Sequence, residues 1–134
     1  MTIEECYRML GGDYAEVLRR LTAPSLIRRF IAKFPQDHTL EQLCAAVEAG
    51  NRADAFRAAH TLKGLSQNLG FGKLRVSAER LTEALRDATD EIPAQVAVLL
   101  QTVKHDCADT VAVIDMYLAS DPSDGTGGRG DIQA

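Results

Sequence analysis

The sequence predicts an all-α fold in which amphipathic helices pack together as a bundle. Apolar residues recur every three or four positions through most of residues 1–118, and glycine or proline separates the periodic segments. Hydrophobic residues make up 46% of the 134 residues and aromatic residues only 5%, so we expect an aliphatic core. Such cores suit helices packed against one another. The length favours one domain.

Four short helices are predicted before residue 51. Thr2 with Glu5, and Thr39 with Gln42, fit the capping-box pattern, in which side chains at a helix start bond to free backbone N–H groups. Asp13 is a good N-cap for another helix. Glycine or proline follows each periodic segment and ends it. The predicted helices cover residues 2–10, 13–21, 25–34 and 39–50.

Residues 51–70 are predicted to form one helix with two chemically different faces, capped at its start by Asn51 and ended by the turn at Gly70 to Gly72. One face is an apolar stripe suited to a core: Ala58, Leu62, Leu65 and Leu69. The other face is polar, at spacing i, i+3, i+4 and i+7: His60, Lys63, Gly64 and Gln67. A glycine inside a helix costs about 1 kcal/mol relative to alanine. Gly64 therefore indicates that something must come close to the backbone.

Two longer helices are predicted to follow. Residues 71–89 carry a stripe expected to pack antiparallel against the 51–70 helix: Leu74, Ala78, Leu81 and Leu85. Pro93 suits the first turn of the last helix. That helix has its own stripe: Val96, Leu100, Val103, Cys107, Val111, Ile114 and Leu118. The last stripe also fits a coiled-coil strand, but the lack of clear charge pairing beside it favours packing within the chain.

The composition changes after Ser120 to Asp, Pro, Ser, Gly and Thr. Such a segment has nothing to bury and is expected to remain flexible. We therefore predict one helical domain over residues 1–119 and a C-terminal tail over residues 120–134.

Composition and motifs disfavour several classes of function. The net charge of −4 and the absence of a Lys/Arg-rich block argue against nucleic-acid binding. No apolar run is long enough for a membrane span and no N-terminal signal pattern is present, so we expect a cytoplasmic protein. Cys6, Cys44 and Cys107 match no metal or redox spacing and are expected to be buried in a reducing compartment. His38 and His105 also lack metal-ligand spacing, so we expect no metal or cofactor.

The polar face of the 51–70 helix has the residue types that phosphoryl chemistry needs. A neutral imidazole, here His60, is a good nucleophile for phosphorus. Lys63, one turn away, is placed to neutralise phosphoryl oxygens as charge moves between donor and acceptor. Gly64 provides room beside the histidine. A solvated surface His–Lys pair is the alternative interpretation, but it gives no reason for the glycine.

The same residues resemble a known family. The run His60-Thr61-Leu62-Lys63-Gly64, followed by Asn68, Gly70 and Leu74, is similar to the signature of the histidine-containing phosphotransfer (HPt) domain. The resemblance extends from about residue 2 to residue 118. It implies an up-down antiparallel four-helix bundle with short N-terminal covering helices.

The resemblance also implies a function. His60 would take a phosphoryl group from the aspartate of a receiver domain and pass it to another receiver. In this family the Mg²⁺ ion and the acidic cluster that drive transfer belong to the receiver. The chain is therefore expected to be a monomeric phosphocarrier rather than an enzyme. Its expected partners are the receiver domains of response regulators and of hybrid histidine kinases.

Further residues are candidates for supporting roles around His60. Thr82 and Arg86 are candidates for a hydrogen bond to the imidazole or to a phosphate on it. Family members often use a glutamine or a basic residue there, so Thr82 is a departure. The other candidates for clearance and docking are Gly64, Gln67, Phe56, Ala59, Arg57, Leu65 and Phe71. Of these, Leu65 fits the core better than an interface, and Phe56 fits either. The surrounding basic residues predict a locally basic surface for an acidic partner: Arg52, Arg57, Lys63, Lys73 and Arg75.

Two other interpretations stay open. A helical adaptor would bind receiver or kinase domains without phosphotransfer, but all three key residues, His60, Lys63 and Gly64, are present. The histidine-bearing module of a chemotaxis-type kinase is the second alternative, but the chain contains no dimerisation or ATP-binding domain. The phosphocarrier interpretation is therefore favoured.

Overall fold

Helix starts and stops written into the sequence account for the order of the elements. The structure, a computed structural model, describes residues 1–86 and 90–120, and its regular elements in these ranges are all helical. They are α1 (Ile3–Met9), α2 (Tyr14–Leu21), α3 (Pro24–Lys33), the 3-10 helix η1 (Phe34–Gln36), α4 (Thr39–Glu48), α5 (Arg52–Leu69), α6 (Gly72–Leu85) and α7 (Val96–Ser120). The predicted all-α fold is confirmed.

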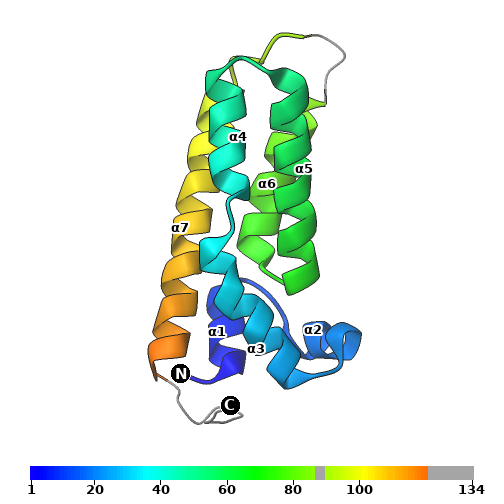
Figure 1. The fold of residues 1–134 in the computed structure, drawn as a ribbon. Coiled ribbons are helices and arrows are strands. Elements are labelled where there is room, and N and C mark those ends of the chain that lie inside the picture. Colours follow the sequence, from blue (N-terminus) through cyan, green and yellow to red (C-terminus); the bar gives the residue numbers. More distant parts are fainter. Residues whose placement is uncertain (87–89, 121–134) are drawn as a thin grey trace.

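The long helices form an up-down antiparallel four-helix bundle. Helix α5 packs against α4 and α6, and α6 packs against α7. Short turns join α4 to α5 and α5 to α6, which makes these sequence neighbours antiparallel neighbours in space. Helix α7 is the longest and runs the whole height of the molecule in Figure 1. Helices α1 to α3 lie below α4–α6 in that view; α1 and α3 contact α7, whereas α2 lies on the side away from it. The predicted N-terminal cover corresponds to α1 and α2, and in the structure α3 lies at the same end of the bundle.

The core consists mainly of aliphatic side chains from the predicted stripes. Its largest fully buried members include Leu43, Leu62, Leu74, Leu81, Leu85 and Ile114. The whole stripe of α6 is buried, and in α5 only Leu65 is half-exposed. Full burial of a leucine stabilises the fold by about 1.5–3 kcal/mol, so these two stripes fix the face that α5 turns inward. The opposite face of α5 is thereby left to solvent.

Local signals predicted the first helix accurately. Thr2 and Glu5 form the capping box: the Thr2 N–H donates to the Glu5 carboxylate at 2.7 Å, and the Glu5 N–H donates to the Thr2 hydroxyl at 3.1 Å. The Asp13 carboxylate accepts the Ala15 N–H at 3.0 Å and starts α2. Each cap satisfies N–H groups that a helix start leaves free.

The second predicted capping box is wrong. Thr39 is the first residue of α4 and is buried, and the N-cap position belongs to His38, whose side chain makes no capping bond. The Asp37 carboxylate takes the Thr39 N–H instead, at 2.9 Å. An aspartate that bonds to the backbone two residues on closes a local turn and supplies the same missing acceptor.

Three predicted helix boundaries are shifted in the structure. Helix α3 ends at Lys33 and η1 follows it, because Pro35 fits the first turn of a new helical segment. Helix α6 ends at Leu85 rather than at residue 89, and residues 87–89 lie outside the described part. Helix α7 begins at Val96, since Pro93 lies in the turn before it and its carbonyl accepts the Val96 N–H at 3.1 Å.

The second half of α7 differs from its predicted stripe by one position. Val111 and Leu118 are half-buried, whereas Thr110, Val113 and Tyr117 are buried. The buried sequence Val96, Leu100, Val103, Cys107, Thr110, Ile114 and Tyr117 keeps a regular alternation of four and three residues. Helix α7 contacts α1, α3 and α6, and Figure 1 shows α1 and α3 at its C-terminal end, so the packing is within the chain, as favoured.

Three further predictions concern the cysteines, membrane-spanning segments and the C-terminal tail. Cys6 and Cys107 are buried and Cys44 is half-buried; all three are free thiols. Burial raises the pKa of the Cys6 thiol to about 11. Across residues 1–86 and 90–120, no helix combines the length and hydropathy that a membrane crossing requires. The predicted tail lies outside the described residues apart from Ser120, which ends α7.

Candidate functional site

Helix α5 carries the polar face that the sequence singled out. Its start is fixed by Asn51, whose side chain accepts the Asp54 N–H at 3.0 Å. Its end is fixed by Gly70, which adopts the left-handed conformation at φ +77°. Only glycine takes this conformation without steric cost, so the turn to α6 begins there. The polar residues thus lie in the middle of an 18-residue helix rather than at a fraying end.

The polar face of α5 is open to solvent. His60, Gly64 and Gln67 are exposed, and Lys63 is half-buried. A lysine that covers apolar surface with its stem and keeps its amine in water is typical of a helix flank. Among the described residues no acidic side chain forms a salt bridge with Lys63. The ammonium therefore remains available beside the imidazole.

Gly64 borders empty space. A Cβ atom built at this position would meet no atom within 4 Å outside the local helix backbone. No contact within the described chain therefore requires glycine there. Gln67 and Gly64 line a shallow recess together with Glu16, Arg20 and Asn68. The recess exposes the backbone of α5 one turn after His60.

An aromatic ring lies against the imidazole. Phe56, one turn before His60, is half-buried, and its ring is stacked on the His60 ring with 6.0 Å between centroids and 14° between planes. From the end of α6, the Arg86 guanidinium carbon lies 5.0 Å from the Phe56 centroid. The guanidinium also pairs with the Glu83 carboxylate at 3.0 Å. Arg86 thus reaches the ring that contacts the histidine.

Three predicted supporting residues do not lie on the exposed face. Thr82 is fully buried and donates its hydroxyl to the Ala78 carbonyl at 2.7 Å, so it is not available to an exposed imidazole. Ala59 is fully buried in the bundle. Phe71 is fully buried too, with its ring at 5.0 Å from that of Phe34 in an edge-to-face contact. These residues contribute to the core rather than to a docking surface.

Much of the predicted basic surface is already paired. Arg57 forms an ion pair with Asp54 one turn earlier on α5, and Arg75 pairs with Glu79 on α6 at 2.8 Å. Arg52 donates to the Leu85 carbonyl. The carboxylates of Asp54 and Glu79 partly neutralise Arg57 and Arg75, which weakens the attraction for an acidic partner that the sequence suggested, whereas the carbonyl bonded to Arg52 leaves its charge in place. Leu65, the remaining apolar candidate, is half-buried and lines a pocket with residues of α3 and η1.

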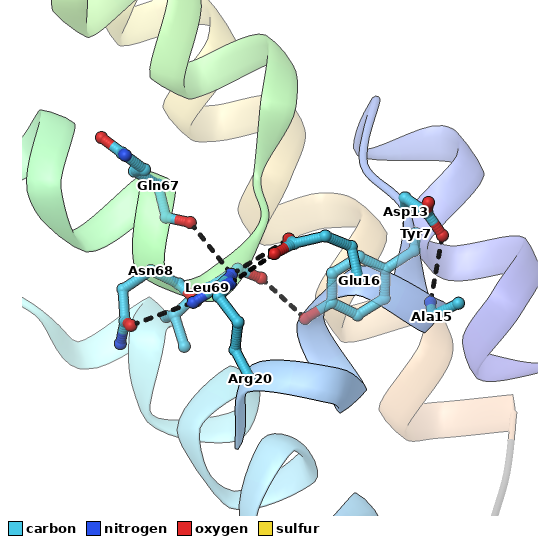
Figure 2. Close-up of polar contacts among 8 residues, drawn as sticks. All are labelled: Tyr7, Asp13, Ala15, Glu16, Arg20, Gln67, Asn68 and Leu69. Atoms are coloured by element: carbon cyan, nitrogen blue, oxygen red, sulfur yellow. Dashed lines mark hydrogen bonds and ion pairs between the residues drawn. The ribbon is translucent and has the colours of Figure 1, made fainter. Parts of the chain in front are cut away.

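The C-terminal end of α5 is held by residues that sequence reasoning missed (Figure 2). The buried Tyr7 hydroxyl donates to the Leu69 carbonyl at 2.7 Å. Arg20 on α2 donates to the Asn68 carbonyl at 3.0 Å and pairs with Glu16 at 2.6 Å. The carbonyls at a helix C-terminus have no partners within the helix, so these donors satisfy them. Of these contacts, only the Glu16–Arg20 ion pair could have been predicted from the sequence, because the two residues are four positions apart on one helix.

The fold and the exposed histidine face define a class of protein. Residues 25–108, more than half of the chain, match the family model described as Hpt domain. The chain belongs to the Hpt domain family, so its role is phosphotransfer in two-component signalling, with receiver domains as the kind of partner it meets. Hpt domains are phosphotransfer carriers rather than enzymes in the usual sense. Neither the curated proteins nor the solved structures gave a significant match.

Proposed function

We propose that His60 accepts a phosphoryl group from the aspartyl phosphate of one receiver domain and passes it to the aspartate of another. The observation that carries the proposal is the combination on one face of α5 of an exposed His60, a Lys63 without a salt bridge to any described residue, and an unobstructed Gly64. The other histidines lack this setting. His38 contacts the Glu41 carboxylate at 2.8 Å, and His105 has neither a lysine three residues later nor a glycine four residues later.

The chemistry requires one nucleophilic nitrogen and a way to offset charge. An imidazole nitrogen of His60 forms a bond to phosphorus while the bond from phosphorus to the aspartate oxygen breaks. The receiver carboxylate leaves with the electron pair, and the reverse step loads the next receiver. Lys63 stabilises the negative oxygens that pass between the two groups. The chain itself then supplies a nucleophile, a cation and clearance.

Open backbone at Gly64 is the feature that a solvated His–Lys pair does not explain. An alanine there would fit without touching the rest of the described chain and would strengthen the helix by about 1 kcal/mol. The glycine is therefore best explained by an approaching partner. Close approach brings the phosphorus within reach of the imidazole.

The test is transfer of labelled phosphate from a panel of phosphorylated receiver domains. Wild-type protein is expected to drain label from at least one receiver and to hold it in acid-labile form. His60→Gln should abolish the label, whereas His105→Gln, a histidine on the exposed side of α7, should retain it. Circular dichroism checks that both variants keep their helices. A wild-type protein that binds receivers without draining label would be an adaptor and would overturn the proposal.

A further inference from the structure

The rings of Phe56 and His60 are nearly parallel on the exposed face of α5. They lie one helical turn apart, at the i, i+4 spacing that brings two side chains together. An exposed imidazole on a helix otherwise samples several rotamers, and ordering it costs conformational entropy. The contact at 14° between ring planes restricts that freedom before any partner arrives.

The phenyl ring is itself held from a second helix. The Arg86 guanidinium lies 5.0 Å from its centroid, within the distance of a cation–π interaction. Glu83 accepts hydrogen bonds from Arg86 at 3.0–3.2 Å and fixes the guanidinium in turn. The bond to Arg86 lowers the pKa of the Glu83 carboxyl, so the acceptor stays ionised in neutral solution. The end of α6 thereby supports a ring on α5.

Stacking orients an imidazole without occupying its nitrogens. The ring nitrogens direct their lone pair or proton in the plane of the ring, whereas Phe56 contacts the face. Within residues 1–86 and 90–120, no hydrogen bond is made to either nitrogen of His60. A hydrogen bond from a side chain would hold the ring equally well, but it would engage one of the two atoms able to attack phosphorus. The aromatic contact leaves both free.

We propose that Phe56 is a positioning residue that holds the His60 ring ready for in-line attack, and that Arg86 acts through Phe56 rather than on the imidazole itself. The proposal rests on the function proposed for His60 and adds the groups that orient it. It also gives Arg86 a different role from the direct hydrogen bond that the sequence suggested. Because a receiver presents its phosphoryl group in one orientation, a disordered imidazole lowers the fraction of productive encounters.

The experiment compares a ring-deleting variant with a ring-retaining one. Phe56→Leu keeps apolar bulk, Phe56→Tyr keeps the ring, and Phe30→Leu removes another half-buried ring, on α3, as the matched control. Each variant is measured at saturating concentration of a phosphorylated receiver that serves the wild type. We expect Phe56→Leu to slow transfer about three- to tenfold, in proportion to a typical aromatic pair contact. Phe56→Tyr and Phe30→Leu should stay close to wild type.

Two further measurements separate positioning from folding and from nucleophilicity. The His60 ring protons should carry a ring-current shift in NMR spectra that Phe56→Leu removes and Phe56→Tyr retains. Reaction with phosphoramidate, a small donor without fixed orientation, should change less than twofold in Phe56→Leu. Arg86→Gln, a surface change, should reduce the ring-current shift and the receiver rate in the same direction but by less.

The possible outcomes distinguish this inference from the function on which it rests. Unchanged His60 ring-proton shifts in Phe56→Leu would overturn the inference, whether or not the protein carries phosphate. Equal losses with receiver and with phosphoramidate would also overturn it, because they indicate a general defect. A wild-type protein that accepts label from no receiver would overturn the proposed function. The ring-proton shifts would still show whether Phe56 holds the His60 ring.

Discussion

The middle and the end of helix α5 use glycine in opposite ways. At Gly64, in the middle, an added Cβ would meet nothing within 4 Å. At the turn after α5, a Cβ on Gly72 would lie 2.0 Å from the Gly11 carbonyl oxygen, and one on Gly70 would lie 2.4 Å from a Val17 methyl group. The end glycines serve contacts within the chain. The middle glycine serves none, which is why a partner outside the chain is the best explanation for it.

Other contacts show the same contrast between the two regions. The end of α5 is tied to the N-terminal cover by the Tyr7 and Arg20 hydrogen bonds. The start of α6 is tied to it as well, because the Lys73 N–H donates to the Leu10 carbonyl at 3.1 Å. Around His60 the described contacts are a ring stack and surface ion pairs. Rigid packing at one end thus holds in place a face that stays accessible. Each prediction below tests one side of this comparison.

Replacing Gly72 by alanine should have the largest effect on stability. The added Cβ would overlap the carbonyl carbon and oxygen of Gly11. Both are backbone atoms, so they cannot rotate away as the end of a side chain could. We expect the free energy of unfolding to fall by about 3 kcal/mol, the upper part of the usual range for overpacking. Chemical denaturation followed by circular dichroism measures it. Gly64→Ala is the matched control, and a Gly72→Ala protein as stable as wild type would contradict the close packing.

Removing the hydroxyl of Tyr7 should have the next largest effect. In Tyr7→Phe the buried Leu69 carbonyl loses its donor, which costs about 1–2 kcal/mol. Tyr117→Phe is the control, because that ring is equally buried and its hydroxyl bonds to no described residue. The denaturation midpoints of the two variants are compared with that of the wild type, and Tyr7→Phe should lower the midpoint more than Tyr117→Phe does. Similar losses would show that the Tyr7 bond contributes nothing specific.

The same tyrosine gives a pH dependence. Burial raises the pKa of Tyr7 above its ordinary value of 10. The unfolded chain therefore loses the phenolic proton first as pH rises, so the contribution of Tyr7 to stability is complete below pH 10 and declines above it. Tyr7→Phe should flatten the alkaline side of the stability profile, whereas Tyr117→Phe should leave the Tyr7 contribution in place.

Local signals explain how much of this could be predicted from sequence. The caps at Thr2, Asp13 and Asn51 and the left-handed Gly70 depend on residues within one turn of one another, so they were predictable. The exposed setting of His60 followed from the opposite apolar stripe. The first half of the apolar stripe on α7 was predicted correctly. In the second half the prediction placed the apolar Val111 in the core, whereas the regular alternation of four and three residues buries Thr110 instead.

Contacts between distant residues were not predictable. Tyr7 and Leu69 are 62 positions apart, and nothing local marks a tyrosine that will reach a helix end. Thr82 was expected beside His60 because counting back from the turn placed it opposite the histidine, at the edge of the apolar stripe, but it is buried and its hydroxyl bonds back to Ala78 in the same helix. A threonine can be buried without loss when it donates in this way. The Arg86–Phe56 contact depends on how α6 ends, and the predicted end was at residue 89.

Gly64→Ala should have a smaller effect of opposite sign on stability. The new methyl group has free space, so the helix gains about 1 kcal/mol from alanine's propensity. Transfer from a phosphorylated receiver should nevertheless slow, because the methyl group occupies the space that the partner approaches. Thermal unfolding and transfer assays on the same preparation test both. A variant that is more stable and fully active would contradict the clearance role of Gly64.

The ion pair between Glu83 and Arg86 should give the smallest effect, since exposed pairs contribute little to folding. Arg86 lowers the Glu83 pKa, so any stabilisation is present above the ordinary value near 4.5 and is lost as pH falls through the lowered folded value. Arg86→Gln should return the pKa toward 4.5 in a carboxyl NMR titration. Glu16 is the internal control, because its pKa is lowered by Arg20 and should not move. An unchanged pKa of Glu83 in Arg86→Gln would contradict the Glu83–Arg86 ion pair. The contact with the Phe56 ring would then be the interaction that positions the Arg86 guanidinium.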